Sequence, residues 1–285
     1  MRTKSPTKMV VFNVNCGKLV EFLKKASAKG TITITKTAKI SDDFFKNFYL
    51  EAIEDRLEVK AIDSHGSTMW IWHKLSGVEV EEEGKFAVTN PAILLKILSF
   101  IKNDREISFI YEEDKPLTIA TIGTPFKGFE IREDFTLEAK QIKDYKNNVL
   151  SFISVHKFEE RPRIEADGKT AEYDTVFVFD SSDLNGIIQQ TIEFTKDQDL
   201  VMTMSDGSIM FNSGKKNSSK TNDKFEIAII NPIEFTQSFG NLQPIIPHMY
   251  KDIHFYLRMA SDKKIKMWIQ SKSGDIELNF ITGAK

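Results

Sequence analysis

Apolar and polar positions divide the chain into four copies of one pattern. In each copy a β-rich run is followed by a capping residue, a helix-length amphipathic segment and further β-rich runs. The copies open with the sequences VVFNVN, FAVTNP, VFVFDSS and FEIAIINP. Each helical segment spans only about a dozen residues, which is too short to be stable alone in water. We therefore expect each helix to lie on a sheet, in an α+β fold of repeated β-α-β-β units.

Capping and proline signals set the expected helix starts in the first half of the chain. Asn15 is placed to cap a helix over Cys16 to Ala28, and a Thr/Ile strand follows Gly30. In the second copy Asn90 precedes Pro91, and proline is tolerated in a first helical turn because its missing N–H would have no intrahelical partner.

The second half carries equivalent signals. Ser181 or Ser182 is expected to cap the third helix, and Asp206-Gly207 to form a hairpin turn between two strands. The pair Asn231-Pro232 repeats the Asn-Pro opening and predicts a fourth helix. The β-like runs that follow are expected to break at two polar pairs, Ser261-Asp262 and Ser273-Gly274.

Pairing of the four units predicts two similar domains, residues 1–132 and 175–285. Residues 133–174 interrupt the repeat and are predicted to be an irregular, highly charged connection, within which VLSFISV could pair with a sheet edge. A length of 285 residues suits two domains, and 41% hydrophobic residues can fill both cores. The alternative is coincidence, because α+β domains often alternate in this way.

Cysteine content and hydropathy bear on the compartment. The single cysteine, Cys16, excludes an internal disulfide and is predicted to be a buried helix residue instead of a catalytic thiol. The basic N-terminus lacks a following apolar segment of signal-peptide length, and no run of about eighteen apolar residues occurs. We expect an intracellular protein that is neither secreted nor inserted in a membrane.

Positive charge concentrates on the first two helical segments, although the net charge is −2. On a helical wheel Lys18 and Lys25 share the polar side of the first helix, while Leu19 and Leu23 face inward. Acidic residues gather elsewhere, as at positions 79–83. This distribution suits DNA that faces the helices. The alternative interpretation is that these lysines only solvate exposed helix faces.

Signals for catalysis or metal binding are weak. None of the five histidines has a partner at a familiar metal spacing. Asp63-Ser64-His65 contains the residue types of a nucleophilic triad, but three sequence neighbours cannot easily converge in triad geometry, and a turn is favoured. The polar segment 214–224 is either a simple hairpin connection or a loop that contacts phosphates through Lys215, Lys216 and Lys220. We expect no enzyme activity, no cofactor and no metal site.

Several stretches resemble DNA sliding clamps of the two-domain kind, typified by proliferating cell nuclear antigen and the clamps of tailed phages. They are LVEFLKKA, FYLEAIEDRLEVKAIDSHGSTMWIW, FAVTNPAILLKILSFIKNDREISFIY and VFVFDSSDLNGIIQQTIEFTKDQDLVMTMSDGSIMF. The order of elements matches over nearly the whole chain. The resemblance implies a homotrimeric ring that encircles duplex DNA, with helices lining the hole and sheets outside. Such a ring is a processivity factor, which tethers the DNA polymerase, is loaded by a clamp-loader ATPase and serves other replication or repair proteins.

The resemblance also implies two functional surfaces. The residues that would face DNA are Lys18, Lys25, Lys29, Lys96, Lys102 and Lys196. The pocket for short partner peptides would lie near the inter-domain connection and a turn, at Ile62, Asp63, Ser64, His65, Val149, Phe152 and Ile153. Subunits would pair edge strands, for which the candidates lie near Leu117 to Ile122 and near Ile209 or Ile276.

Some features depart from the clamp pattern. The third and fourth helical segments carry almost no cation except Lys196, and the end of the chain, ELNFITGAK, lacks the Leu-Ala-Pro phrase of the cellular clamps. These differences indicate a viral or otherwise divergent member. Two alternatives therefore stay open: a repair or transcription clamp of the same fold, and a β-rich viral structural or assembly protein without a role on DNA.

Overall fold

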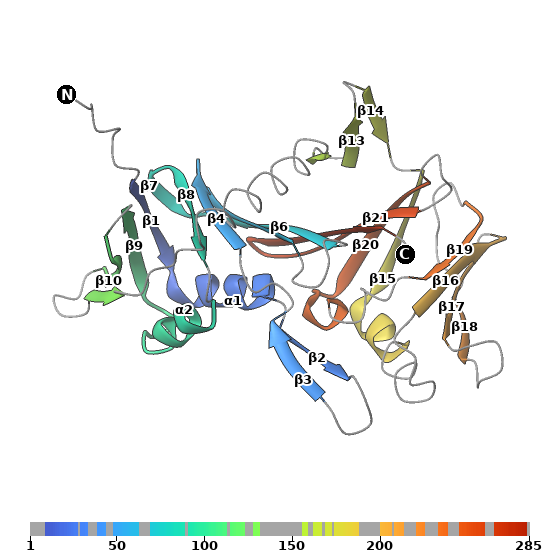
Figure 1. Ribbon diagram of the computed structural model, residues 1–285, viewed down its shortest axis with the longest axis horizontal. Coiled ribbons are helices and arrows are strands. Elements are labelled where there is room, and N and C mark those ends of the chain that lie inside the picture. Colours follow the sequence, from blue (N-terminus) through green and yellow to red (C-terminus); the bar gives the residue numbers. More distant parts are fainter. Residues whose placement is uncertain are drawn as a thin grey trace.

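A computed structural model describes most of both halves of the chain. The described residues are 9–27, 29–33, 39–43, 48–62, 69–88, 91–112, 115–122, 128–131, 156–158, 162–166, 169–172, 174–187, 200–206, 208–213, 221–225, 233–238, 245–259 and 265–283. We call residues 9–131 the N-terminal half and residues 174–283 the C-terminal half. Both consist of short helices on antiparallel sheets, so the α+β class predicted from the sequence is confirmed (Figure 1).

The N-terminal half contains two helices among its strands. Its elements are β1 (Met9–Asn15), α1 (Cys16–Ser27), β2 (Lys29–Thr33), β3 (Lys39–Asp43), β4 (Phe48–Ile53), β5 (Arg56–Ile62), β6 (Met69–Ser76), β7 (Glu79–Glu82), β8 (Gly84–Val88), α2 (Pro91–Leu98), β9 (Glu106–Glu112), β10 (Leu117–Thr121) and β11 (Gly128–Ile131).

The remaining elements begin with three short strands and continue into the C-terminal half. They are β12 (His156–Phe158), β13 (Pro162–Ala166), β14 (Lys169–Glu172), β15 (Thr175–Asp180), β16 (Leu200–Ser205), β17 (Ser208–Ser213), β18 (Thr221–Phe225), β19 (Phe235–Ser238), the 3₁₀ turn η2 (Ile246–His248), β20 (Asp252–Met259), β21 (Ile265–Ser273) and β22 (Ile276–Gly283). Residues 181–187 form a helix between β15 and β16.

One eight-stranded sheet runs through both halves, in the order β15-β20-β21-β22-β6-β5-β4-β8. The halves meet where β22 pairs antiparallel with β6, a junction that we call the seam. A five-stranded sheet, β11-β10-β9-β1-β7, flanks it in the N-terminal half, and a four-stranded sheet, β18-β17-β16-β19, in the C-terminal half. Strands β12–β14 and β2–β3 form two smaller sheets.

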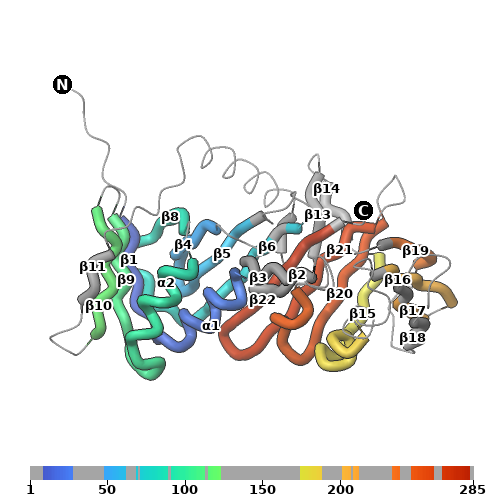
Figure 2. The backbone as a smooth tube through the Cα atoms, turned by 60° about the horizontal axis from the view of Figure 1, so that its bottom comes forward, coloured from blue at the N-terminus to red at the C-terminus, as the bar shows by residue number. Residues whose placement is uncertain are grey.

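The helices lie on one side of these sheets. Figures 1 and 2 show α1, α2 and the yellow helix at residues 181–187 on the same side. Figure 1 shows β13 and β14 on the other side. Alternate strand residues such as Leu57 and Val59 are buried toward the helices. Buried side chains of both halves form one continuous core, in which Phe12 stacks on Phe109 with ring centroids 4.8 Å apart. The short helices are therefore held by apolar burial on the sheets.

The predicted elements of the first half are largely confirmed. Helix α1 starts at Cys16, and Asn15 caps it by accepting the backbone N–H of Lys18 at 3.2 Å. Helix α2 begins at Pro91. Cys16 is fully buried, as expected, and burial raises the pKa of its thiol.

Hairpin turns of the second half also occur where they were predicted. Ser205 pairs with Ser208 at the predicted hairpin, and Asp206, which follows Ser205, has a φ of 51°. Ser273 pairs with Ile276, and Gly274 in that turn has a φ of 54°. The predicted break at Ser261-Asp262 lies outside the described residues.

In the second half the predicted third helix is confirmed at residues 181–187, but its predicted cap and the predicted fourth helix are wrong. The third helix is capped by Asp180, not by Ser181 or Ser182, because Asp180 accepts the backbone N–H of Ser182 at 2.8 Å. The fourth predicted helix is replaced by a strand over Phe235–Ser238, which pairs with β16 and buries Phe235 in the core. Cross-strand pairing thus overrides the Asn-Pro signal, whose residues Asn231 and Pro232 lie outside the described part.

The predicted irregular connection is partly structured. Strands β12, β13 and β14 form an antiparallel three-stranded sheet within it, whereas the VLSFISV stretch lies outside the described residues. The predicted edge strands are also wrong, because β10, β17 and β22 each pair on both sides. Strands β11 and β18 are at the sheet edges instead. No helix within the described ranges is long and apolar enough to cross a membrane.

Candidate nucleic-acid and partner-binding surfaces

Helix α1 is amphipathic and presents a basic outer side. Leu19, Phe22 and Leu23 are fully buried beneath it, whereas Lys18 and Lys24 are exposed. The spacing of the buried residues, at intervals of three and four, is that of a helix lying on a sheet.

Further cations lie at the end of α2. Lys96 is exposed in the last turn, where Ser99 donates its hydroxyl to the Lys96 carbonyl at 2.6 Å. Lys102 is exposed too, but it follows the helix, which ends at Leu98. Two of the predicted DNA-facing lysines therefore lie close together in sequence at one exposed end of α2.

The polar side of α1 contacts the C-terminal half. Lys25 donates to the backbone carbonyl of His248 at 2.6 Å, and its ammonium lies 4.7 Å from the centroid of the Tyr250 ring. The Tyr250 hydroxyl donates to Glu21 at 2.8 Å. Lys18 forms an ion pair with Asp275 in the turn between β21 and β22. Three α1 residues that share one helix side thus reach across the seam.

The pKa values of the side chains in these contacts reflect their position between α1 and the C-terminal half. Burial lowers the pKa of Lys25 despite the opposing charge of Glu21. Burial and the hydrogen bond to Glu21 raise the pKa of Tyr250. The hydrogen bond and charge of Asp275 raise the pKa of Lys18. Lys25 therefore differs from a freely solvated surface lysine.

Other predicted DNA-contacting lysines are less well defined. Lys29 is the first residue of β2. Lys196 and the loop lysines Lys215, Lys216 and Lys220 lie outside the described residues. Their proximity to DNA stays a prediction.

The predicted partner pocket is described at one residue. Ile62 ends β5 opposite Trp70, which pairs with Ile281 of the C-terminal half. Ile281 pairs in turn with Trp268, and the Trp268 ring stacks on the Tyr256 ring with the ring centroids 4.6 Å apart. This register brings apolar residues of both halves into one row at the end of β5. The remaining predicted pocket residues, Asp63, Ser64, His65, Val149, Phe152 and Ile153, lie outside the described residues.

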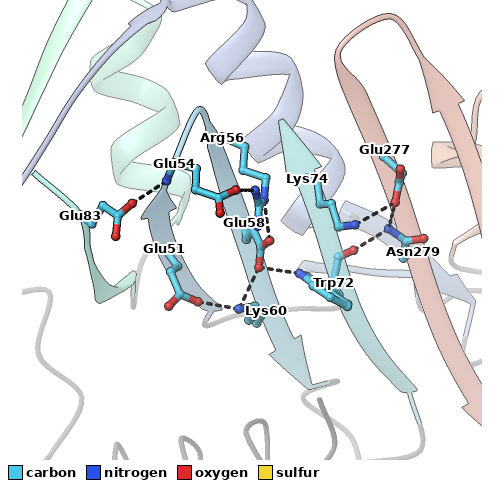
Figure 3. A network of polar contacts seen from close by, with 10 residues as sticks. All are labelled: Glu51, Glu54, Arg56, Glu58, Lys60, Trp72, Lys74, Glu83, Glu277 and Asn279. Atoms are coloured by element: carbon cyan, nitrogen blue, oxygen red, sulfur yellow. Dashed lines mark hydrogen bonds and ion pairs between the residues drawn. The ribbon is translucent and has the colours of Figure 1, made fainter. Parts of the chain in front are cut away.

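A polar network lies beside that row on the helix-free face of the eight-stranded sheet (Figure 3). Glu58, only 3% exposed, accepts hydrogen bonds from Arg56 at 2.9 Å and Trp72 at 2.8 Å, and it pairs with Lys60 at 2.8 Å. Burial alone would raise the pKa of Glu58, but Lys60, Arg56 and Trp72 outweigh it and lower that pKa. A buried carboxylate is therefore fully compensated.

Within the described ranges, no group of three His, Cys, Asp or Glu side chains is arranged to hold a metal ion. The contacts across the seam were not predicted from the sequence. Their partners Tyr250 and Asp275 lie more than 220 positions from α1, and no local pattern marks such pairs.

Solved structures share this arrangement of elements. The chain is similar to Proliferating Cellular Nuclear Antigen (PCNA) from Entamoeba histolytica, with 11% identity and a TM-score of 0.64, over 97% of this chain and 98% of that one. It is also similar to a structure described as the C-terminal region of FEN-1 bound to A. fulgidus PCNA, with 10% identity and a TM-score of 0.62, over the same shares of both chains. No family model and no curated protein matches the sequence.

Proposed function

Because the chain has the PCNA-like sliding-clamp fold, we propose that it is a DNA sliding clamp that encircles duplex DNA and tethers the replicative DNA polymerase. The observation that supports this most strongly is the match to PCNA structures over 97% of the chain. The proposed clamp has two domains, residues 1–132 and 175–285. It acts inside the cell as a scaffold without enzymatic chemistry.

Ring assembly is proposed to use the outermost strands of two sheets at opposite ends of the subunit. Strand β11 ends the five-stranded sheet, and β18 ends the four-stranded sheet. The other edge of the five-stranded sheet, β7, has the sequence EVEE, and such charge disfavours pairing with another strand. Pairing of β11 with β18 of the next subunit would close a homotrimer and leave the helices facing inward.

DNA would be held by diffuse attraction. Lys96 in the last turn of α2 and Lys102 just after α2 are both exposed, and lysine attracts phosphates as a point charge without reading bases. Contacts of this kind permit movement along the duplex. Topological enclosure, not affinity, would keep the protein on DNA.

Partner proteins are proposed to bind where β5 ends, beside the apolar row of Trp70, Ile281 and Trp268. The pocket would take apolar anchors of short peptide motifs from the polymerase and from repair proteins. A clamp-loader ATPase would be needed to open the ring. The FEN-1 complex supports such a peptide-binding role, because it involves a protein of the same fold.

Two experiments test the proposal: imaging of the assembly, and retention of the loaded protein on circular and on linear DNA. Negative-stain images of concentrated protein should show rings with an open centre and three-fold symmetry. After loading, the protein should stay on closed circular DNA through gel filtration and be released when one restriction cut linearises the circle. Equal loss from circular and linear DNA would refute enclosure, and particles without a central hole would refute the ring.

A further inference from the structure

We propose that α1 is a brace between the two halves: Lys18, Glu21 and Lys25 dock onto the C-terminal half and fix the angle at the seam. Their roles are therefore to position the halves, and Lys25 does not contact DNA phosphates. This inference goes beyond the clamp function, and only the statement about DNA phosphates rests on that function.

The three α1 residues form a single contact strip. They are spaced by three and four positions, which places them along one side of the helix. Each has a partner in the C-terminal half: Asp275 for Lys18, the Tyr250 hydroxyl for Glu21 and the His248 carbonyl for Lys25. The strip spans α1 from its first turn to its last, so that the whole helix is attached across the seam.

The receiving segment is itself anchored. The backbone N–H of Tyr250 donates to the hydroxyl of Ser271 on β21 at 3.2 Å. The backbone N–H groups of His248 and Met249 donate to the carbonyls of Ile245 and Ile246, which closes the η2 turn. A fixed partner is needed if a contact is to transmit force between the halves.

The strand pairing at the seam is incomplete, so the angle between the halves needs support from outside the sheet. Its paired positions stop at Glu277 opposite Lys74 and resume at Phe280 opposite Ile71, so the ladder is interrupted at its centre. A sheet bends most easily about a line parallel to its strands, and contacts within the sheet plane resist that bending poorly. Helix α1 lies to one side of the sheet (Figure 2). A contact at that distance from the seam opposes rotation of the two halves about the seam more effectively than a contact within the sheet.

The same contacts remove Lys25 from the basic surface. Its ammonium is committed to a carbonyl and to the face of Tyr250, and a phosphate contact would require both to be given up. Lys24, the preceding residue, is exposed. The chain therefore offers two adjacent lysines of the same helix with different predicted roles.

The experiment compares Lys25→Met with Lys24→Met, which remove the same charge from the same helix. Hydrogen exchange is measured on the protein without DNA. In Lys25→Met, we expect amides of residues 245–251 to exchange roughly tenfold faster, as the loss of one charge-assisted hydrogen bond implies. In Lys24→Met their exchange should equal that of the parent protein. Tyr250→Phe, which removes only the donor to Glu21, provides a milder variant that should also accelerate exchange.

Two results would overturn the brace. One is equal exchange in Lys25→Met, Lys24→Met and Tyr250→Phe. The other is a reduced salt dependence of equilibrium binding to a short linear duplex in Lys25→Met with unchanged exchange, which would make Lys25 a phosphate contact. Failure of the clamp proposal itself would appear as an absence of rings and of DNA retention in the parent protein, and the exchange measurement does not depend on either.

Discussion

Asn279 of β22 donates its backbone N–H to the Nδ1 atom of His73 on β6, at 3.1 Å, in the interrupted centre of the seam. Because Nδ1 accepts, the neutral ring carries its proton on Nε2, a buried atom without a hydrogen-bond partner in the described part of the chain. Burial, together with the charges of His248 and Lys25, lowers the pKa of His73 to about 3. A neutral histidine is thus built into the junction of the two halves.

Acid should weaken the fold through this residue. Folded His73 stays neutral, whereas unfolded His73 takes up a proton below its ordinary pKa of 6.5. The free energy of unfolding should therefore fall as the pH drops from about 6.5 toward 3, with a contribution of at most ~1.4 kcal/mol per pH unit. Urea unfolding at pH 7.5, 6.0 and 5.0 measures this slope.

The variant His73→Leu isolates that contribution. At pH 7.5 it should be less stable by about 1–3 kcal/mol, because the buried Asn279 N–H loses its acceptor. Its stability should fall less steeply toward acid, so that the two proteins converge at pH 5.0. Parallel curves for parent and variant would show that His73 does not supply the slope.

Removing Lys60 should destabilise the protein strongly. Glu58 is almost fully buried, and Lys60→Met would leave its carboxylate with only Arg56 and Trp72 as partners. We expect a loss of about 3 kcal/mol in the free energy of unfolding, measured in urea at neutral pH.

A surface lysine of the same face provides the control. Lys85 lies 4.0 Å from Glu51, and its side chain is 35% exposed, so Lys85→Met should change stability by only about 0.5 kcal/mol. In the double variant Lys60→Met/Glu58→Leu, most of the loss should be recovered, because no unpaired charge remains buried. Equal losses for Lys60→Met and Lys85→Met would contradict a compensated buried carboxylate.

Local signals predicted local structure well. The capping of α1 by Asn15, the start of α2 at Pro91 and the turn at Gly274 each depend on a few neighbouring residues. The fold class followed from the repetition of such signals. By contrast, the segment Phe235–Ser238 became a strand because β16 offered it a partner, which is a non-local effect.

Function-related geometry was harder to predict. The helical-wheel projection of the sequence correctly places Lys18 and Lys25 on one side of α1. It cannot show that the C-terminal half covers that side. Edge strands were misassigned for a similar reason, because the neighbours of β10 and β17 depend on the later strands β11 and β18. Contacts between residues far apart in sequence leave no periodic pattern.

The cap of α1 can be tested with two substitutions at one position. Asn15→Ala removes the acceptor for the Lys18 N–H and should lower the free energy of unfolding by about 1 kcal/mol. Asn15→Asp keeps an acceptor and adds a negative charge at the helix N-terminus, so it should retain the stability of the parent. Thermal unfolding distinguishes them, and equal melting temperatures for the two variants would argue against the cap.

The lysines at the end of α2 should account for part of the salt dependence of DNA binding. If Lys96 and Lys102 each neutralise one phosphate, the double variant Lys96→Ala/Lys102→Ala should reduce the slope of log affinity against log salt by up to about 1.8. The matched control is Lys266→Ala/Lys272→Ala, which removes two exposed lysines of β21 that alternate with buried Ile265 and Ser271 and so face away from the helices. Equilibrium binding to a short linear duplex, which the protein can leave at its ends, is measured between 50 and about 300 mM salt and gives the slope. An equal reduction in both double variants would mean that total charge, not the helix-bearing side, attracts the DNA.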